Sequence, residues 1–173
     1  MKSKFAPIYA LFLLTFFLVS NSSNPPDGRT GAPGDGNCNN CHTGNNTNNF
    51  EGTLEIQGLP EQITPNASYT LNVVAKKTAG DAVRAGFQMV ILDDDNQNIG
   101  TFSNPGSNAV LKEDENRNYF EHNPAQRFED QDEVSWTVDW TAPEEANTGI
   151  NVCLLYTSPS PRDATLSRMP SSA

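Results

Sequence analysis

Residues 133–141, EVSWTVDWT, decide the fold. The apolar side chains of this stretch occupy every second position: Val134, Trp136, Val138 and Trp140. Successive side chains of a β-strand point to opposite faces, so this spacing predicts a strand with one buried face. Pro143 follows two residues after the stretch and ends the pattern, because proline cannot donate to a strand ladder.

Alternating runs of the same kind recur on both sides, separated by segments rich in Gly, Pro, Asn and Asp. They predict strands at residues 53–57, 68–77, 87–93, 98–102, 118–122 and 149–152. Outside the N-terminus we find no convincing helical stripe. About seven strands in about a hundred residues predict an all-β fold, an immunoglobulin-like antiparallel β-sandwich.

A second stretch, NCNNCHTG at residues 37–44, carries the chemistry. Cys-x-x-Cys-His is the attachment motif of c-type haem, in which Cys38 and Cys41 form thioethers to one porphyrin and His42 binds the iron. Three alternatives stay open: a thiol–disulfide redox motif, half of a zinc site, and a small disulfide between the two cysteines. The Gly-, Asn- and Pro-rich flanks predict that the motif lies on an exposed N-terminal loop.

His122 is the other histidine of the chain, and we predict that it is the second axial ligand of the haem iron. Met89 is the main sulfur alternative. A hydrogen-bonded or surface histidine at a strand end explains His122 equally simply. The sequence alone does not show that the strand of His122 passes near the N-terminal loop.

The N-terminus has the pattern of a secretory signal peptide. Lys2 and Lys4 precede an apolar run at residues 5–19, and small residues near Ser22 predict cleavage there. A retained membrane anchor is the alternative, although the run is short for a spanning helix and contains Pro7. We therefore expect a secreted, cell-surface or periplasmic protein without a retained membrane span.

The net charge of −10 argues against nucleic acid and anionic membranes as partners. We expect instead a redox or cell-surface partner, which the sequence does not identify. The acidic run at residues 93–95 fits a hairpin turn better than a calcium loop. Acidic residues at 113–115 and 129–133 are interpreted as solvated loops. No catalytic Ser/His/Asp set or phosphate loop is recognisable, so we do not expect an enzyme.

The last 21 residues, 153–173, break the pattern. CLLYTSPSPRD and SRMPSSA resemble the conceptual translation of a sequencing adapter and a flow-cell primer. We therefore expect that the natural protein continues differently after about Val152, which would cut its last strand short and make Cys153 non-native. A genuine Ser/Pro-rich tail is the alternative.

Three segments together resemble a bacterial secreted domain of the choice-of-anchor V type, which is similar to the reelin N-terminal (Reeler) domain. They are PPDGRTGAPGDGNCNNCHTG, AGFQMVILDDDNQNIGTF and the YFEHNPAQRF…VSWTVDWTAP region. The resemblance implies a signal peptide, a β-sandwich and a variable C-terminal anchoring segment. The expected organisation is a signal peptide at 1–22, a motif segment at 23–50, a β-sandwich at 51–152 and a non-native tail at 153–173.

Two functions follow from these observations. The first is a secreted c-type haem domain, working in electron transfer or in another haem-linked role at the cell surface. The second is a non-catalytic adhesion or interaction module in which the motif forms a disulfide or is unused.

Overall fold

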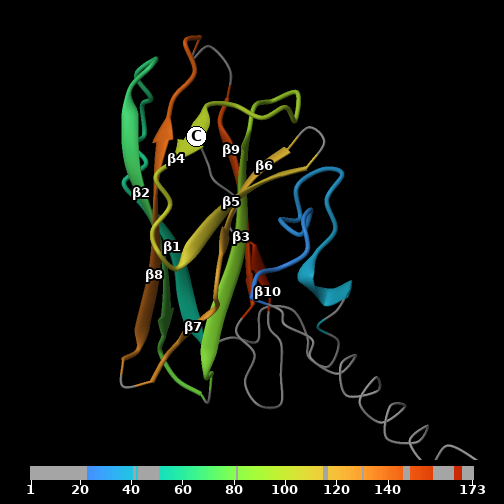
Figure 1. Cartoon of the computed structure of the whole chain (residues 1–173), viewed down its shortest axis with the longest axis vertical. Coiled ribbons are helices and arrows are strands. Elements are labelled where there is room, and N and C mark those ends of the chain that lie inside the picture. The colour runs from blue at the N-terminus through green and yellow to red at the C-terminus, as the bar shows by residue number, and fades with distance from the viewer. Residues whose placement is uncertain are drawn as a thin grey trace, which may run out of the picture.

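The computed structural model describes residues 23–40, 42, 51–80, 82–114, 117–129, 131–145, 149–157 and 166–168. Two antiparallel sheets face each other across a common core (Figure 1). The predicted β-sandwich is therefore confirmed. The one helical element in these ranges is a single 3-10 turn, η1 (Cys38–Asn40).

The four-stranded sheet has the order β1-β2-β8-β4. Its strands are β1 (Gly52–Gln57), β2 (Ser68–Lys77), β8 (Glu133–Thr141) and β4 (Thr101–Ser103). The stretch that decides the fold, β8, lies inside this sheet and pairs with β2 over nine residues. Its side chains alternate between buried and more exposed along its length, as the sequence predicts.

The other sheet has the order β10-β9-β3-β6-β5, and β7 also pairs with β3. Its strands are β3 (Arg84–Leu92), β5 (Ala109–Asp114), β6 (Arg117–His122), β7 (Gln126–Arg127), β9 (Asn151–Thr157) and β10 (Leu166–Arg168). The sequence did not predict β5. Glu113 and Asp114, interpreted as loop residues, lie in this strand and are exposed. Charged side chains are typical of an edge strand, where they discourage pairing with other chains.

The core between the sheets is aromatic. Trp136 and Trp140 of β8 are buried, and Phe87 of β3 meets Trp136 with ring centroids 4.9 Å apart. Phe120 of β6 makes an edge contact with Phe87, again at 4.9 Å. Both tryptophans thus pack between the sheets rather than on a ligand, and the alternation of β8 arises from this core.

Strand β3 is buried on both faces. Phe87, Met89 and Ile91 point into the core between the sheets. Val90 and Leu92 point the other way and form a second apolar cluster with Ala32 of the N-terminal segment. Figure 1 shows this segment, in blue, on the side of the six-stranded sheet that faces away from the four-stranded one.

The prediction of an exposed N-terminal loop is confirmed in part: Asn37 and His42 are exposed, whereas the middle of residues 23–40 packs on β3. Thr30 and Ala32 are 0% and 2% exposed. Turns bonded through Gly31, Asp35 and Gly36 give the segment a compact shape. It is a third layer, because the apolar outer face of β3 must be covered. Two predicted features lie outside the described residues: the other flank of the motif at 43–50 and the signal peptide predicted at 1–22.

Strand β9 continues past Val152, the expected last residue of the sandwich, to Thr157. It pairs with β3 over seven residues, and Leu154 and Tyr156 join the main core. The continuous apolar run at residues 152–156 explains this burial on both faces whatever the origin of the segment. The adapter origin of residues 153–173 stays a prediction.

Replacing Leu71 by alanine tests the core. Leu71 is fully buried on β2, so Leu71→Ala is expected to lower the free energy of unfolding by about 2–5 kcal/mol. Glu55→Ala, at an exposed position of the neighbouring β1, is the control and should change it by no more than about 0.5 kcal/mol. Urea titration measures both values. Equal effects of the two substitutions would contradict the assigned faces.

Candidate functional site

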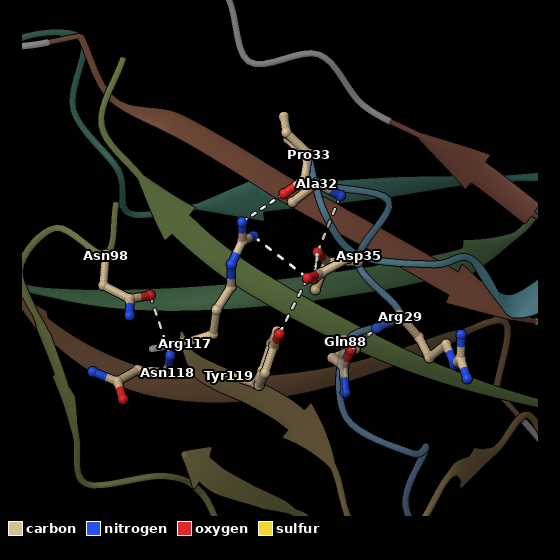
Figure 2. A network of polar contacts seen from close by, with 10 residues as sticks. Arg29, Ala32, Pro33, Asp35, Gln88, Asn98, Arg117, Asn118 and Tyr119 are labelled. Atoms are coloured by element: carbon tan, nitrogen blue, oxygen red, sulfur yellow. Dashed lines mark hydrogen bonds and ion pairs between the residues drawn. The ribbon is translucent and has the colours of Figure 1, made fainter. Parts of the chain in front are cut away.

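A polar network centred on Asp35 holds the N-terminal segment against β6 (Figure 2). One carboxylate oxygen of Asp35 accepts a hydrogen bond from Tyr119 at 3.2 Å and lies 3.5 Å from the guanidinium of Arg117. The other oxygen accepts a hydrogen bond from Thr30. Arg117 also donates to the carbonyl of Pro33. This ion pair is well shielded from water, since the side chain of Asp35 is only 6% exposed.

Tyr119 is the most strongly perturbed member of this network. Burial, and then the charge of Asp35 and its hydrogen bond, raise the pKa of the Tyr119 phenol well above its usual value. The phenol therefore stays protonated and keeps donating to Asp35 at any ordinary pH.

A second network holds the same segment against the outer face of β3 and β6. Glu121 is fully buried, and its carboxylate accepts hydrogen bonds from Gln88 at 2.7 Å and from Asn24 at 2.9 Å. Gln88 in turn donates to the carbonyl of Pro26 and accepts from the backbone N–H of Arg29. Burial raises the pKa of Glu121, and the two donated hydrogen bonds oppose that shift. Because a buried polar group without a hydrogen-bond partner is costly, these side chains favour the one position of the segment in which all of these bonds form.

The first half of the motif is a helical turn at the end of this segment. The side chain of Asn37 accepts from the backbone N–H of Asn39 at 3.1 Å, which caps the turn. The backbone N–H of His42 donates to the carbonyl of Cys38 at 2.9 Å, which closes it. Cys38 is half-buried, with its sulfur 3.7 Å from the carbonyl oxygen of Arg29. Cys41 lies outside the described residues.

His122 is buried at the end of β6, with 8% of its surface exposed. Its Nδ1 lies 2.8 Å from the backbone nitrogen and 2.9 Å from the carbonyl oxygen of Phe87. The ring lies over Gly86, where an added Cβ would come within 2.5–2.8 Å of three ring atoms. Burial lowers the pKa of His122, and the hydrogen bond to Phe87 opposes that shift more weakly. The imidazole is therefore held in its neutral form.

One cavity of about 460 Å³ joins these elements. Cys38, His42 and His122 all line it, from the N-terminal segment on one side and the end of β6 on the other. Its volume falls within the range of about 300–1,000 Å³ that is typical of small-molecule sites. The structure thus brings together three of the four predicted site residues, which lie up to 84 positions apart in the chain.

Met89, the sulfur alternative, is not part of this cavity. Its side chain is fully buried in the core between the sheets, on the opposite face of β3 from Gln88.

The acidic run at 93–95 forms a turn. Asp93 accepts from the backbone N–H groups of Asp95 and Gln97, and Asp94 accepts from Gly149. The carboxylates of Asp93 and Asp94 therefore stabilise the loop by accepting hydrogen bonds from its backbone.

The sequence analysis missed four residues that build the site: Arg29, Gly86, Gln88 and Glu121. Two of them left a signal. A glycine inside a strand pattern, as at position 86, often marks a close approach by another group. A polar side chain inside an apolar run, as Gln88 in AGFQMVIL at 85–92, marks a position that needs partners. Arg29 and Glu121 left no such signal, because both have polar neighbours in the sequence.

Comparison with solved structures found similar folds at low identity. The Reelin-N domain of F-spondin is 19% identical, over 74% of this chain and 91% of that one, with a TM-score of 0.46. The human F-spondin reeler domain is 18% identical, over 73% and 93%, with a TM-score of 0.44. A DUF4466 family protein from Parabacteroides merdae is 8% identical, over 71% and 44%, with a TM-score of 0.39.

Likenesses this weak add nothing to the assignment of the fold, which rests on the strand pairing of this chain. Comparison with models of protein families found no match, and neither did comparison with curated proteins. Within the described ranges, no helix is long and apolar enough to cross a bilayer. Over the same ranges, no three His, Cys, Asp or Glu side chains gather into a metal-binding group.

Gly86→Ala tests how His122 is held. The new methyl group would overlap the imidazole, so the ring is expected to leave its place on Phe87, at a cost of about 1–3 kcal/mol in stability. Nuclear Overhauser contacts between the His122 ring and the Phe87 amide should disappear. Gly106→Ala is the control, because the nearest atom to its Cβ is a flexible side-chain oxygen at 3.3 Å. Unchanged contacts in the Gly86 variant would show that the ring is placed otherwise.

Tyr119→Phe tests the docking of the N-terminal segment. Loss of the bond to a buried carboxylate is expected to lower the unfolding free energy by about 1–2 kcal/mol at neutral pH. The folded-state pKa of Tyr119 is raised, so its contribution is fully present below the unfolded pKa of about 10 and is lost as the pH rises further.

The two proteins should therefore converge in stability above about pH 10. Urea titrations from pH 8 to 11 measure this convergence. Tyr69→Phe, which removes only an exposed hydrogen bond to Thr64, should keep the alkaline loss of the wild type. A constant difference between wild type and Tyr119→Phe across this range would contradict the assignment.

Proposed function

We propose that this chain is an exported domain that binds one haem covalently and works in electron transfer or another haem-linked role at the cell surface. Cys38 and Cys41 would form the thioethers, His42 would be the proximal ligand, and His122 the distal one. The observation that carries the proposal is the single cavity lined by Cys38, His42 and His122. The motif, the predicted iron ligand and the remote histidine thus face one space.

The state of His122 suits a metal ligand. A ligating imidazole is neutral, offers one nitrogen to the metal and donates from the other to a carbonyl or carboxylate. When Nδ1 of His122 carries the proton, it can donate to the carbonyl of Phe87. Nε2 then presents a lone pair, and no hydrogen bond engages it among the described residues. Gly86 provides the space in which the ring holds this orientation.

The walls of the cavity suit a flat, largely apolar group. Pro25 and Pro26 line it from the N-terminal segment, and Phe87 and Gly86 line it from β3. Rigid walls of this kind limit rearrangement, which favours reversible one-electron exchange at a bound haem. The chemistry is the cofactor's, and these residues would bind it, orient it and shield it.

Export is part of the proposal. Residues 1–22 have the pattern of a signal peptide, and covalent haem attachment in bacteria takes place outside the cytoplasm. The same location would suit a cell-surface partner.

Expression of the full chain with the machinery for c-type maturation tests the proposal. We expect a haem-stained band on a denaturing gel, a Soret absorbance and a mass about six hundred daltons above that of the mature polypeptide. Cys38→Ala with Cys41→Ala should abolish all covalent attachment. His122→Ala should retain attachment but change the iron from six-coordinate low spin to high spin, whereas Met89→Leu should leave the spectrum unchanged.

A colourless protein whose mass is about two daltons below the reduced value would contain a disulfide, which overturns the haem proposal. The non-catalytic interaction module would then be the better account. A spectrum that changes with Met89→Leu and not with His122→Ala would assign the distal ligand to the sulfur.

A further inference from the structure

The cavity lies between the N-terminal segment and the six-stranded sheet. Cys38 and His42 line it from the segment side, and His122 lines it from the end of β6. The imidazole of His122 is held in place, because its Nδ1 contacts the backbone of Phe87 and its ring lies over Gly86. The separation of the two predicted iron ligands therefore depends on how the segment sits on the sheet.

Asp35 holds the segment from a position outside the cavity. Its carboxylate accepts hydrogen bonds from Thr30 of the segment and Tyr119 of β6, and lies 3.5 Å from the guanidinium of Arg117. Figure 2 shows the side chains of Tyr119 and Arg117 converging on Asp35. The described residues that line the cavity include none of these four. The contacts of Asp35 consequently act on the cavity through the position of the segment.

The backbone between Asp35 and Cys38 is short and tied back by hydrogen bonds. The N–H of Gly36 donates to the carbonyl of Gly28 at 2.9 Å, and the N–H of Gly31 donates to the carbonyl of Gly36 at 3.0 Å. The helical turn that carries Cys38 begins two residues after Gly36. A loop closed in this way moves as a unit, so a displacement of Asp35 also displaces Cys38.

The other network that holds the segment cannot be separated from the cavity in the same way. Gln88 itself lines the cavity, and Glu121 precedes His122 in the chain. A substitution at either position would alter the surroundings of a bound group directly. Asp35 is the contact whose loss leaves the lining of the cavity intact.

We infer that Asp35 is a positioning residue for the haem of the proposed function. By docking the N-terminal segment, it keeps an iron held by His42 within reach of His122. The inference rests on the proposed function. Loss of the Asp35 contacts is expected to let the segment move away from the sheet and so to weaken the bond between the iron and His122.

Carbon monoxide binding to the matured, reduced full-length protein tests the inference. This ligand competes with His122, so its apparent affinity is reduced by the fraction of molecules in which the distal position is open. It is uncharged, so removal of the carboxylate charge has little direct effect on it. We expect Asp35→Asn to bind carbon monoxide about tenfold more tightly, because a hydrogen bond to a charged group changes a local equilibrium by at least about that factor.

Hydrogen exchange on the same loaded variants reports whether the segment has loosened. The backbone N–H of Arg29 donates to Gln88 of the sheet, so this amide is protected while the segment is docked. It should exchange about tenfold faster in Asp35→Asn. Tyr119→Phe removes one hydrogen bond of the same network and should change both measurements in the same direction by less.

Leu71→Ala is the control for a general loss of stability. Leu71 is fully buried in the core between the two sheets and does not line the cavity. Its substitution is expected to destabilise the fold, yet carbon monoxide should bind to this variant as it binds to the wild type. The protection of the Arg29 amide relative to the core amides should also be retained.

Tighter carbon monoxide binding in Asp35→Asn but not in Leu71→Ala supports the inference. Unchanged binding in Asp35→Asn overturns it and leaves the haem proposal standing, even if the Arg29 amide exchanges faster. Equal tightening in Leu71→Ala also overturns it, since the effect would then be general. If Asp35→Asn does not mature, Tyr119→Phe decides by the same criteria. A wild-type protein that carries no haem overturns both the inference and the proposed function.

Discussion

The burial of β3 on both faces is the constraint on which the rest of the structure depends. A strand in a sandwich normally needs one partner, the opposite sheet. From Ala85 to Leu92 this strand is buried on its outer face as well, where Val90 and Leu92 are apolar. About 25 cal/mol is lost for every Å² of apolar surface left in water. A second cover is needed, and residues 23–40 provide it. The N-terminal segment is thus a layer of the fold rather than an appendage.

The polar residues of the outer face determine where that cover sits. Gln88 and Glu121 would be buried without partners if the segment covered this face in another register, and each unsatisfied group would cost more than a hydrogen bond returns. Asn24, Pro26 and Arg29 satisfy them in one register. The Asp35–Arg117 pair holds the other end of the same layer. These contacts consequently fix the turn that carries Cys38 in one position, beside the end of β6.

Most strands could be read from the sequence, because each is a local alternation of apolar and polar side chains. The sequence did not predict β5 or the packing of the N-terminal segment, because neither shows an alternation of apolar and polar side chains. β5 is an edge strand whose charged side chains face water, and it looks like a loop by composition. The N-terminal segment is rich in Gly and Pro, which usually mark exposed chain. Its burial depends on a few residues, among them Thr30 and Ala32, that meet a surface formed elsewhere.

The sequence by itself determined the sandwich, because period-two alternation specifies which face of a strand is buried. For Cys38, Cys41 and His42 it yielded a prediction of haem attachment, which stays a prediction. Only the tertiary structure decided that His122 and Arg29 share a cavity with Cys38. Their proximity arises because the outer face of one strand has to be covered, and no local pattern records which distant segment will cover it.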